Sequence, residues 1–262
     1  AVAALLAQEG VDVEVIVPER LGASVRDPLQ RRYPGVRILE ADARATIPEM
    51  RMAGFAAARA DIVGVIEDHV LVPRDWGRRM LEAHRDGAQV VGGSVGNAAD
   101  ERLVDWAAFL CEYSHCLTPP SGPSPWVTGN NVTYRRDLLE QFGDVIAEGG
   151  WENRLHDAMR DAGIVLLSRP DIRVGHKKHY TIGEYFGQRF LYARSFAGMR
   201  VSGSGAGRRL GYAAAALALP PLLFSRVVSR VLSARVHRQQ LIVSLPLLLL
   251  FVTAWAAGEV VG

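Results

Sequence analysis

Short apolar runs alternate with longer amphipathic segments over the first 200 residues. Runs rich in β-branched residues predict strands, whereas apolar positions repeating every three or four residues predict helices. The expected strands are 13–17, 36–39, 62–66 and 89–95, and the expected helices are 1–10, 26–33, 47–59 and 73–84. This alternation predicts an α/β fold with a mostly parallel sheet flanked by helices. Because the sequence opens on a helix, we expect the first strand to be missing from it.

The pattern continues less regularly to about residue 180. It predicts a helix over 103–116, a Pro/Ser/Gly-rich loop over 118–125, and a strand, polar turn and strand over 126–134. A short helix over 136–142, a helix from Glu152 to Ala162 and extended pieces at 165–167 and 171–174 complete the series. We therefore expect one catalytic-type domain over residues 1–199 and a different region over 200–262.

The C-terminal region is dominated by two apolar segments, 210–225 and 241–258. Residues 241–257 carry no charge, and their length is near the lower limit of the roughly 17–25 residues that span a bilayer. This segment is predicted to span a membrane, the alternative being a buried globular helix. The segment 210–225 is short and interrupted by Pro220 and Pro221, so it either lies in the interface or forms a hairpin with the second segment.

Arginines flank the apolar segment 210–225 on both sides. Arg200, Arg208 and Arg209 precede it, and Arg226, Arg230, Arg235 and Arg238 follow it. Basic flanks are typical of cytoplasmic loops, and a basic cluster attracts anionic lipid headgroups. We expect membrane lipids as partners and a location at the cell membrane, with residues 1–199 on the cytoplasmic side.

The overall charge excludes one class of partner. The chain has 30 basic and 28 acidic residues, so no strong positive field indicates nucleic-acid binding. Cys111 and Cys116 bracket His115, but a structural zinc site needs four ligands and no second cysteine pair is present. These cysteines are interpreted as ordinary thiols.

The most distinctive polar residues are Glu67, Asp68 and His69, which directly follow the expected strand 62–66. In open α/β sheets, ligands bind beyond the carboxyl ends of the strands. Carboxylate and imidazole groups at such a point favour a metal site, although a polar turn would have the same composition.

Further motifs accompany this one in a fixed order. They are Pro48, Arg51, Gly54 and Ala58 before the acidic strand, Gly129-Asn130-Asn131 with Tyr134-Arg135-Arg136, and Trp151–Leu155 followed by Gly163, Pro170 and His176. In order and spacing they resemble the family 2 glycosyltransferases of the GT-A fold, with Glu67-Asp68-His69 as a variant of that family's DxD motif. The resemblance covers roughly residues 1–180.

The resemblance implies a nucleoside diphosphate sugar as donor and Mn²⁺ or Mg²⁺ as cofactor. It assigns the metal to Asp68, His69 and His176, with Glu67 touching the ribose. Glu19 takes the position of the family's nucleotide-binding aspartate. Gly129, Asn130 and Asn131 shape the nucleotide-sugar pocket, although an Asn pair is also typical of a β-turn.

Glu152 occupies the position of the catalytic base, which takes the proton from an acceptor hydroxyl. A helix N-terminal acid that only complements the helix dipole is the alternative. The expected reaction is inverting transfer of the sugar to a lipid-linked or cell-envelope glycan acceptor. Two other functions stay open: a catalytically inactive, membrane-tethered binding or scaffold protein, and a nucleotidyltransferase, whose glycine-rich basic phosphate loop the sequence lacks.

Overall fold

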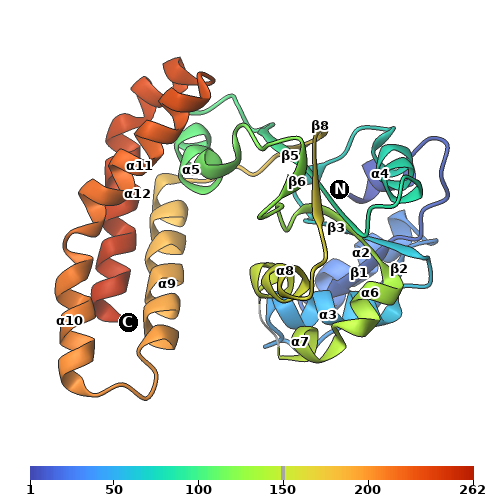
Figure 1. Cartoon of the computed structure of the whole chain (residues 1–262), viewed down its shortest axis with the longest axis horizontal. Coiled ribbons are helices and arrows are strands. Elements are labelled where there is room, and N and C mark those ends of the chain that lie inside the picture. Colours follow the sequence, from blue (N-terminus) through green and yellow to red (C-terminus); the bar gives the residue numbers. More distant parts are fainter. Residues whose placement is uncertain (149–150) are drawn as a thin grey trace. The chain divides into compact units, whose positions relative to one another are not determined.

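The computed structural model describes residues 1–148 and 151–262. The chain forms two compact units (Figure 1). Ala1–Gly96 with Pro119–Gly175 forms a unit of sheets and helices, and Asn97–Thr118 with His176–Gly262 forms a helical unit. The division into domains at residue 199 was expected from hydropathy and stays a prediction.

The first unit contains two sheets. β1 (Ile16–Glu19) and β2 (Arg37–Glu40) pair in parallel as a separate two-stranded sheet. The larger sheet has the order β3 (Ile62–Ile66), β7 (Asn131–Arg135), β5 (Val90–Asn97), β8 (Leu166–His176) and β4 (Val70–Leu71), and β6 (Gly122–Ser124) pairs with β8.

The larger sheet is mixed, so the prediction of a mostly parallel sheet is wrong in this respect. β7 lies between β3 and β5 and runs antiparallel to both, with Val132 opposite Val65 and also opposite Gly92. A late segment of the chain thus enters between two earlier strands, which local periodicity cannot reveal. The two extended pieces predicted at 165–167 and 171–174 are one continuous strand, β8.

Helices surround these sheets, and the positions of two of them matter for the site. The helices of the first unit are α1 (Val2–Leu6), α2 (Ala23–Arg32), α3 (Ile47–Ala57), α4 (Trp76–Arg85), α6 (Arg136–Gln141), α7 (Gly143–Ala147) and α8 (Glu152–Asp161). α3 begins at a capping box of Thr46 and Glu49, with proline in its first turn. Leu155 and Met159 of α8 are buried in a core shared with Val132 and Tyr134 of β7. Apolar packing therefore fixes α8 against the sheet.

The helical unit consists of α5 (Leu103–Tyr113), the 3₁₀ turn η1 (Ser114–Cys116), α9 (Ile182–Arg200), α10 (Ala206–Ala216), α11 (Leu219–Ala234) and α12 (Arg238–Val261). α12 packs closely on α9: a side chain at Gly258 would collide with the Phe190 carbonyl, and Ala193 and Ala197 are buried. Small residues four positions apart allow this approach of the two backbones. α9 is not among the helices expected from the sequence.

α12 has the length and composition of a membrane span, and a large part of its apolar stretch is buried within the structure. This is weak support for a span, because buried core helices share these properties. α10 and α11 are bent by 48° at the break between them. The bend precedes Pro220 and Pro221, which lie in the first turn of α11 instead of interrupting a helix.

Candidate active site

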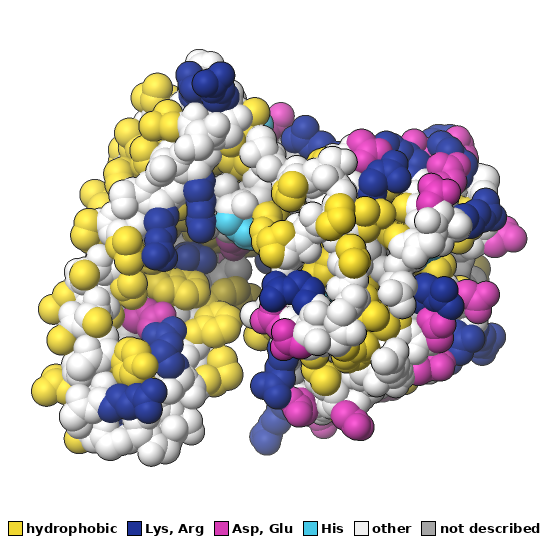
Figure 2. All heavy atoms as spheres, viewed as in Figure 1, with side chains coloured by type: hydrophobic (Ala, Val, Ile, Leu, Met, Phe, Trp, Pro, Cys, Tyr) yellow, Lys and Arg dark blue, Asp and Glu magenta, His cyan; other side chains and the backbone are white. Residues whose placement is uncertain are grey.

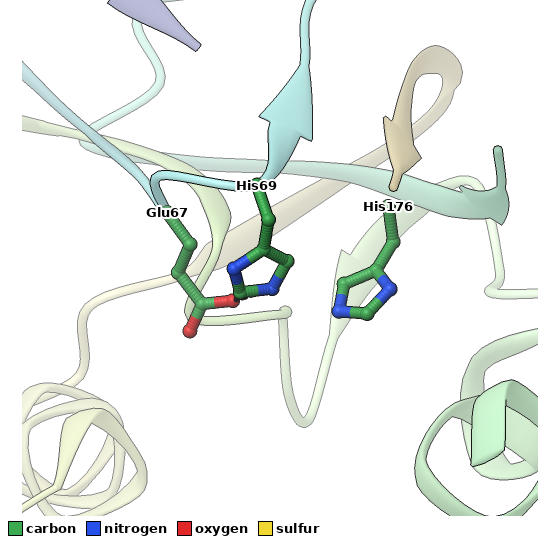
Figure 3. Close-up of side chains that lie close together, drawn as sticks. All are labelled: Glu67, His69 and His176. Atoms are coloured by element: carbon green, nitrogen blue, oxygen red, sulfur yellow. Dashed lines mark ion pairs between the residues drawn. The ribbon is translucent and has the colours of Figure 1, made fainter. Parts of the chain in front are cut away.

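Three side chains gather at strand ends of the larger sheet. Glu67 follows β3, His69 precedes β4, and His176 is the last residue of β8. One potential ligand atom from each lies within 4.8 Å of the other two, and Figure 3 shows the side chains projecting side by side. The structure thus places the side chains of His69 and His176 close together, although they are more than 100 residues apart in the chain, and Glu67 lies beside them.

Glu67 and His69 interact electrostatically. Nε2 of His69 lies 3.3 Å from Oε2 of Glu67, and Nδ1 lies 2.7 Å from Oδ1 of Asp68. Burial alone would lower the pKa of His69, but its hydrogen bonds with the two carboxylates outweigh burial and raise the pKa to about 9. Burial would raise the pKa of Glu67, but His69 and the guanidinium of Arg51 keep it below its usual value.

Asp68 occupies a different place from the one predicted for a metal ligand. Its side chain is 97% exposed and contacts Nδ1 of His69, on the far side of the ring from Nε2, which faces Glu67. A carboxylate that accepts a hydrogen bond from Nδ1–H fixes the ring orientation and leaves Nε2 as the ligand atom. The structure therefore groups Glu67, rather than Asp68, with the two histidines.

The donor atoms of this group suit a metal ion. One carboxylate oxygen and two imidazole nitrogens match a divalent first-row transition ion such as Mn²⁺ better than Mg²⁺, which prefers oxygen ligands. Ligation by His69 requires the neutral ring, so metal binding here is coupled to release of a proton.

Glu152 lies at the first turn of α8 and pairs with Arg51 of α3. Arg51 also approaches Glu67, with Nη2 3.4 Å from Oε1. Glu152 borders a small pocket with a mainly apolar wall formed by Phe55, Val65, Tyr134, Val145, Ile146 and Leu155. The candidate base and the candidate metal ligand Glu67 thus share one arginine as partner.

Gly129 has a steric role at this place. Any Cβ added to it would occupy the position of the Glu152 carboxylate. Its neighbour Asn130 is buried and donates from Nδ2 to Oε2 of Glu67 at 3.3 Å. The segment predicted to shape the nucleotide-sugar pocket therefore contacts both carboxylates.

Asn131, in contrast, belongs to the interior of the sheet. It accepts a hydrogen bond from Nε1 of Trp76 and donates to the carbonyl oxygens of Ser94 and Ile172, all at 2.9 Å. These bonds tie β7 to β5, β8 and α4. They give Asn131 a structural role that the sequence did not indicate.

Glu19 ends β1 and is buried. Its Oε2 accepts from the backbone N–H groups of Leu21 and Gly22, both at 2.9 Å. Its Oε1 has no hydrogen-bond partner among the described residues, and Arg26 lies 3.9 Å away. A buried acceptor of this kind is consistent with a polar ligand beside β1.

Arg51 is among the motif residues but not among the predicted site residues, and the structure places it between Glu67 and Glu152. A basic residue inside an otherwise apolar helix was the available signal, since such a side chain needs a partner when it is buried. The residues Gly149 and Gly150, expected to lead into α8, lie outside the described part of the chain.

Comparisons with known proteins bear on the fold and on the family of the chain. The mannosyltransferase PcManGT from Pyrobaculum calidifontis, solved with GDP-Man and Mn²⁺, superposes with a TM-score of 0.57 at 14% identity, covering 98% of this chain and 81% of that one. GalNAc-T7, solved with UDP, GalNAc and Mn²⁺, gives a TM-score of 0.47 at 16% identity, over 64% of this chain and 37% of that one. No curated protein sequence matches. The family model of glycosyl transferase family 2 matches residues 1–143. The chain belongs to glycosyl transferase family 2, whose members transfer a sugar from a nucleotide sugar.

Proposed function

We propose that this glycosyltransferase catalyses a divalent-metal-dependent, inverting transfer from a nucleoside diphosphate sugar to a hydroxyl acceptor. The observation that supports this most strongly is the gathering of Glu67, His69 and His176 at strand ends, with Glu152 linked to Glu67 through Arg51. This arrangement would provide a cation site and a nearby carboxylate, which are the two groups that the reaction needs.

Glu67, His69 and His176 would hold the metal, and Asp68 would orient His69. A bound divalent cation would stabilise the negative charge on the departing diphosphate. Asn130 supports Glu67 by its hydrogen bond, and Glu19 would contact the nucleoside from the end of β1. The binding of Mn²⁺ by the distant structural relative PcManGT is consistent with this proposal.

Glu152 would act as the base that accepts the proton of the attacking hydroxyl. An apolar wall lies on one side of the partly exposed Glu152 carboxylate, and Gly129 leaves room for it. A single direct displacement with one carboxylate base inverts the anomeric centre. The transition state resembles an oxocarbenium ion, as in glycoside cleavage.

Calorimetry with a panel of nucleoside diphosphates tests this function. We expect at least one of UDP and GDP to bind, and its affinity to fall by an order of magnitude or more when Mn²⁺ is removed with EDTA. Binding that is indifferent to EDTA would contradict metal dependence. Failure of every nucleotide to bind would instead support the inactive scaffold function.

We further propose that the helical unit binds the cytoplasmic face of a membrane, which points to a lipid-linked or membrane-proximal acceptor. α12 exposes Ile242, Val243, Leu249, Leu250, Val260 and Val261. These recur at helical spacing along roughly 29 Å of helix, given 1.5 Å per residue. No charged residue is among the exposed positions of α12 after Gln240. Residues 200–262 contain seven arginines and one glutamate, and Figure 2 shows basic and hydrophobic side chains together on this unit. That combination suits anionic lipid.

Replacing both Leu249 and Leu250 by glutamate tests the membrane proposal. A charge in the hydrocarbon region costs about 2.5–3.5 kcal/mol per residue, so we expect co-sedimentation with vesicles containing phosphatidylserine to fall at least tenfold. Leu21→Glu, at an exposed leucine of the first unit, is the matched control and should leave sedimentation unchanged. Undiminished binding by a double variant of normal helicity would contradict the proposal.

A further inference from the structure

Arg51 connects two carboxylates that come from distant parts of the chain. One guanidinium nitrogen pairs with Oε2 of Glu152, and another lies 3.4 Å from Oε1 of Glu67. The three side chains are on α3, at the end of β3 and at the start of α8. The Arg51 side chain is 15% exposed, and the side chains of Glu67 and Glu152 are 34% and 29% exposed, so both pairs are partly shielded from water.

The backbone around Glu152 leaves its carboxylate dependent on this contact. Glu152 is the first residue of α8, and the backbone N–H groups of the first helical turn have no partner within the helix. Gly129 provides space for the carboxylate but no side chain to hold it. Arg51 is the side chain that forms an ion pair with Glu152 among the described residues.

We propose that Arg51 is a positioning residue that holds Glu152 in its reactive orientation and links it to the metal-site carboxylate Glu67. This inference rests on the proposed role of Glu152 as base. The planar guanidinium can donate to two carboxylates at once in a fixed geometry, whereas a lysine ammonium is a single point charge. The cation also separates two carboxylates that would otherwise repel each other in a shielded site.

A double-mutant cycle on the full chain tests this role. The variants are Arg51→Ala, Glu152→Gln and the double variant, and the readout is release of nucleoside diphosphate from a panel of UDP- and GDP-hexoses with Mn²⁺. We expect Arg51→Ala to lower kcat by roughly 10² with a smaller effect on the donor KM. In the Glu152→Gln background the same replacement should lower kcat by less than threefold, because Arg51 acts through Glu152.

Three further measurements distinguish positioning from a general loss of structure. Guanidinium ion should restore part of the kcat of Arg51→Ala, and Arg51→Lys should retain only part of it, since lysine cannot bridge both carboxylates. Arg59→Ala removes a 77% exposed arginine shortly after α3 and should match the wild type. Additive effects of Arg51→Ala and Glu152→Gln would overturn the inference alone. Full turnover by Glu152→Gln would overturn the proposed base, and the inference with it.

Discussion

Glu152→Gln should lower turnover by roughly 10²–10⁴, the range that general base catalysis contributes, while donor binding stays nearly intact. Glutamine has the shape of glutamate, so it still fits against Gly129. It cannot accept a proton from the acceptor hydroxyl, so the loss falls on kcat. Steady-state release of nucleoside diphosphate, together with calorimetric affinity for the same nucleotide, measures both quantities.

Glu140→Gln is the control for this replacement. Glu140 is an exposed acid on α6 that pairs with Arg136, and its removal should leave kcat unchanged. Wild-type turnover by Glu152→Gln would show that Glu152 only complements the dipole of α8. Equal losses in both variants would point to a change in stability instead of catalysis.

His69→Ala and His176→Ala should each weaken Mn²⁺ binding to the protein–nucleotide complex by more than about 100-fold. Removing a residue that only hydrogen-bonds to a metal ligand costs roughly 10–100-fold in affinity, and removing a ligand itself should cost more. Each replacement removes one of the three ligand atoms that lie within 4.8 Å of one another. Titration of free Mn²⁺ by electron paramagnetic resonance, with UDP or GDP present, gives the affinity directly.

Asp68→Asn separates the two roles considered for Asp68. If Asp68 orients His69 through Nδ1, its replacement should cost less Mn²⁺ affinity than His69→Ala does. An equal loss would make Asp68 itself a ligand, as the sequence motif predicts. His179→Ala is the control, because His179 lies close to His176 in sequence but pairs with Asp105. Unchanged affinity in both His69→Ala and His176→Ala would remove them from the metal site.

Local features of the fold were predictable from the sequence. A β-branched apolar run predicts β3, and a proline with an acid in the first helical turn predicts α3. The structure contains both elements. The same capping signal, Thr181 with Glu184, precedes α9, so that helix could have been found as well. The antiparallel insertion of β7 between β3 and β5 depends on contacts between distant segments, which no local pattern contains.

The site was predictable to a similar extent. The order of motifs predicts site roles for Glu67, His69, His176 and Glu152, because the chemistry requires those residue types at strand and helix ends, and the structure places the first three close together. Which of the two adjacent acids lies close to both His69 and His176 depends on side-chain direction, and the sequence of a turn does not specify that direction. The partnership of Arg51 with two carboxylates is likewise a tertiary contact, between residues 101 positions apart in the case of Glu152.

Anomalous diffraction at the manganese edge, from crystals grown with Mn²⁺ and UDP or GDP, tests the central claim most directly. We expect one strong anomalous-difference peak between Glu67, His69 and His176, with the diphosphate beside it. A nucleotide bound with no manganese between these side chains, or with manganese held by other residues, would contradict it.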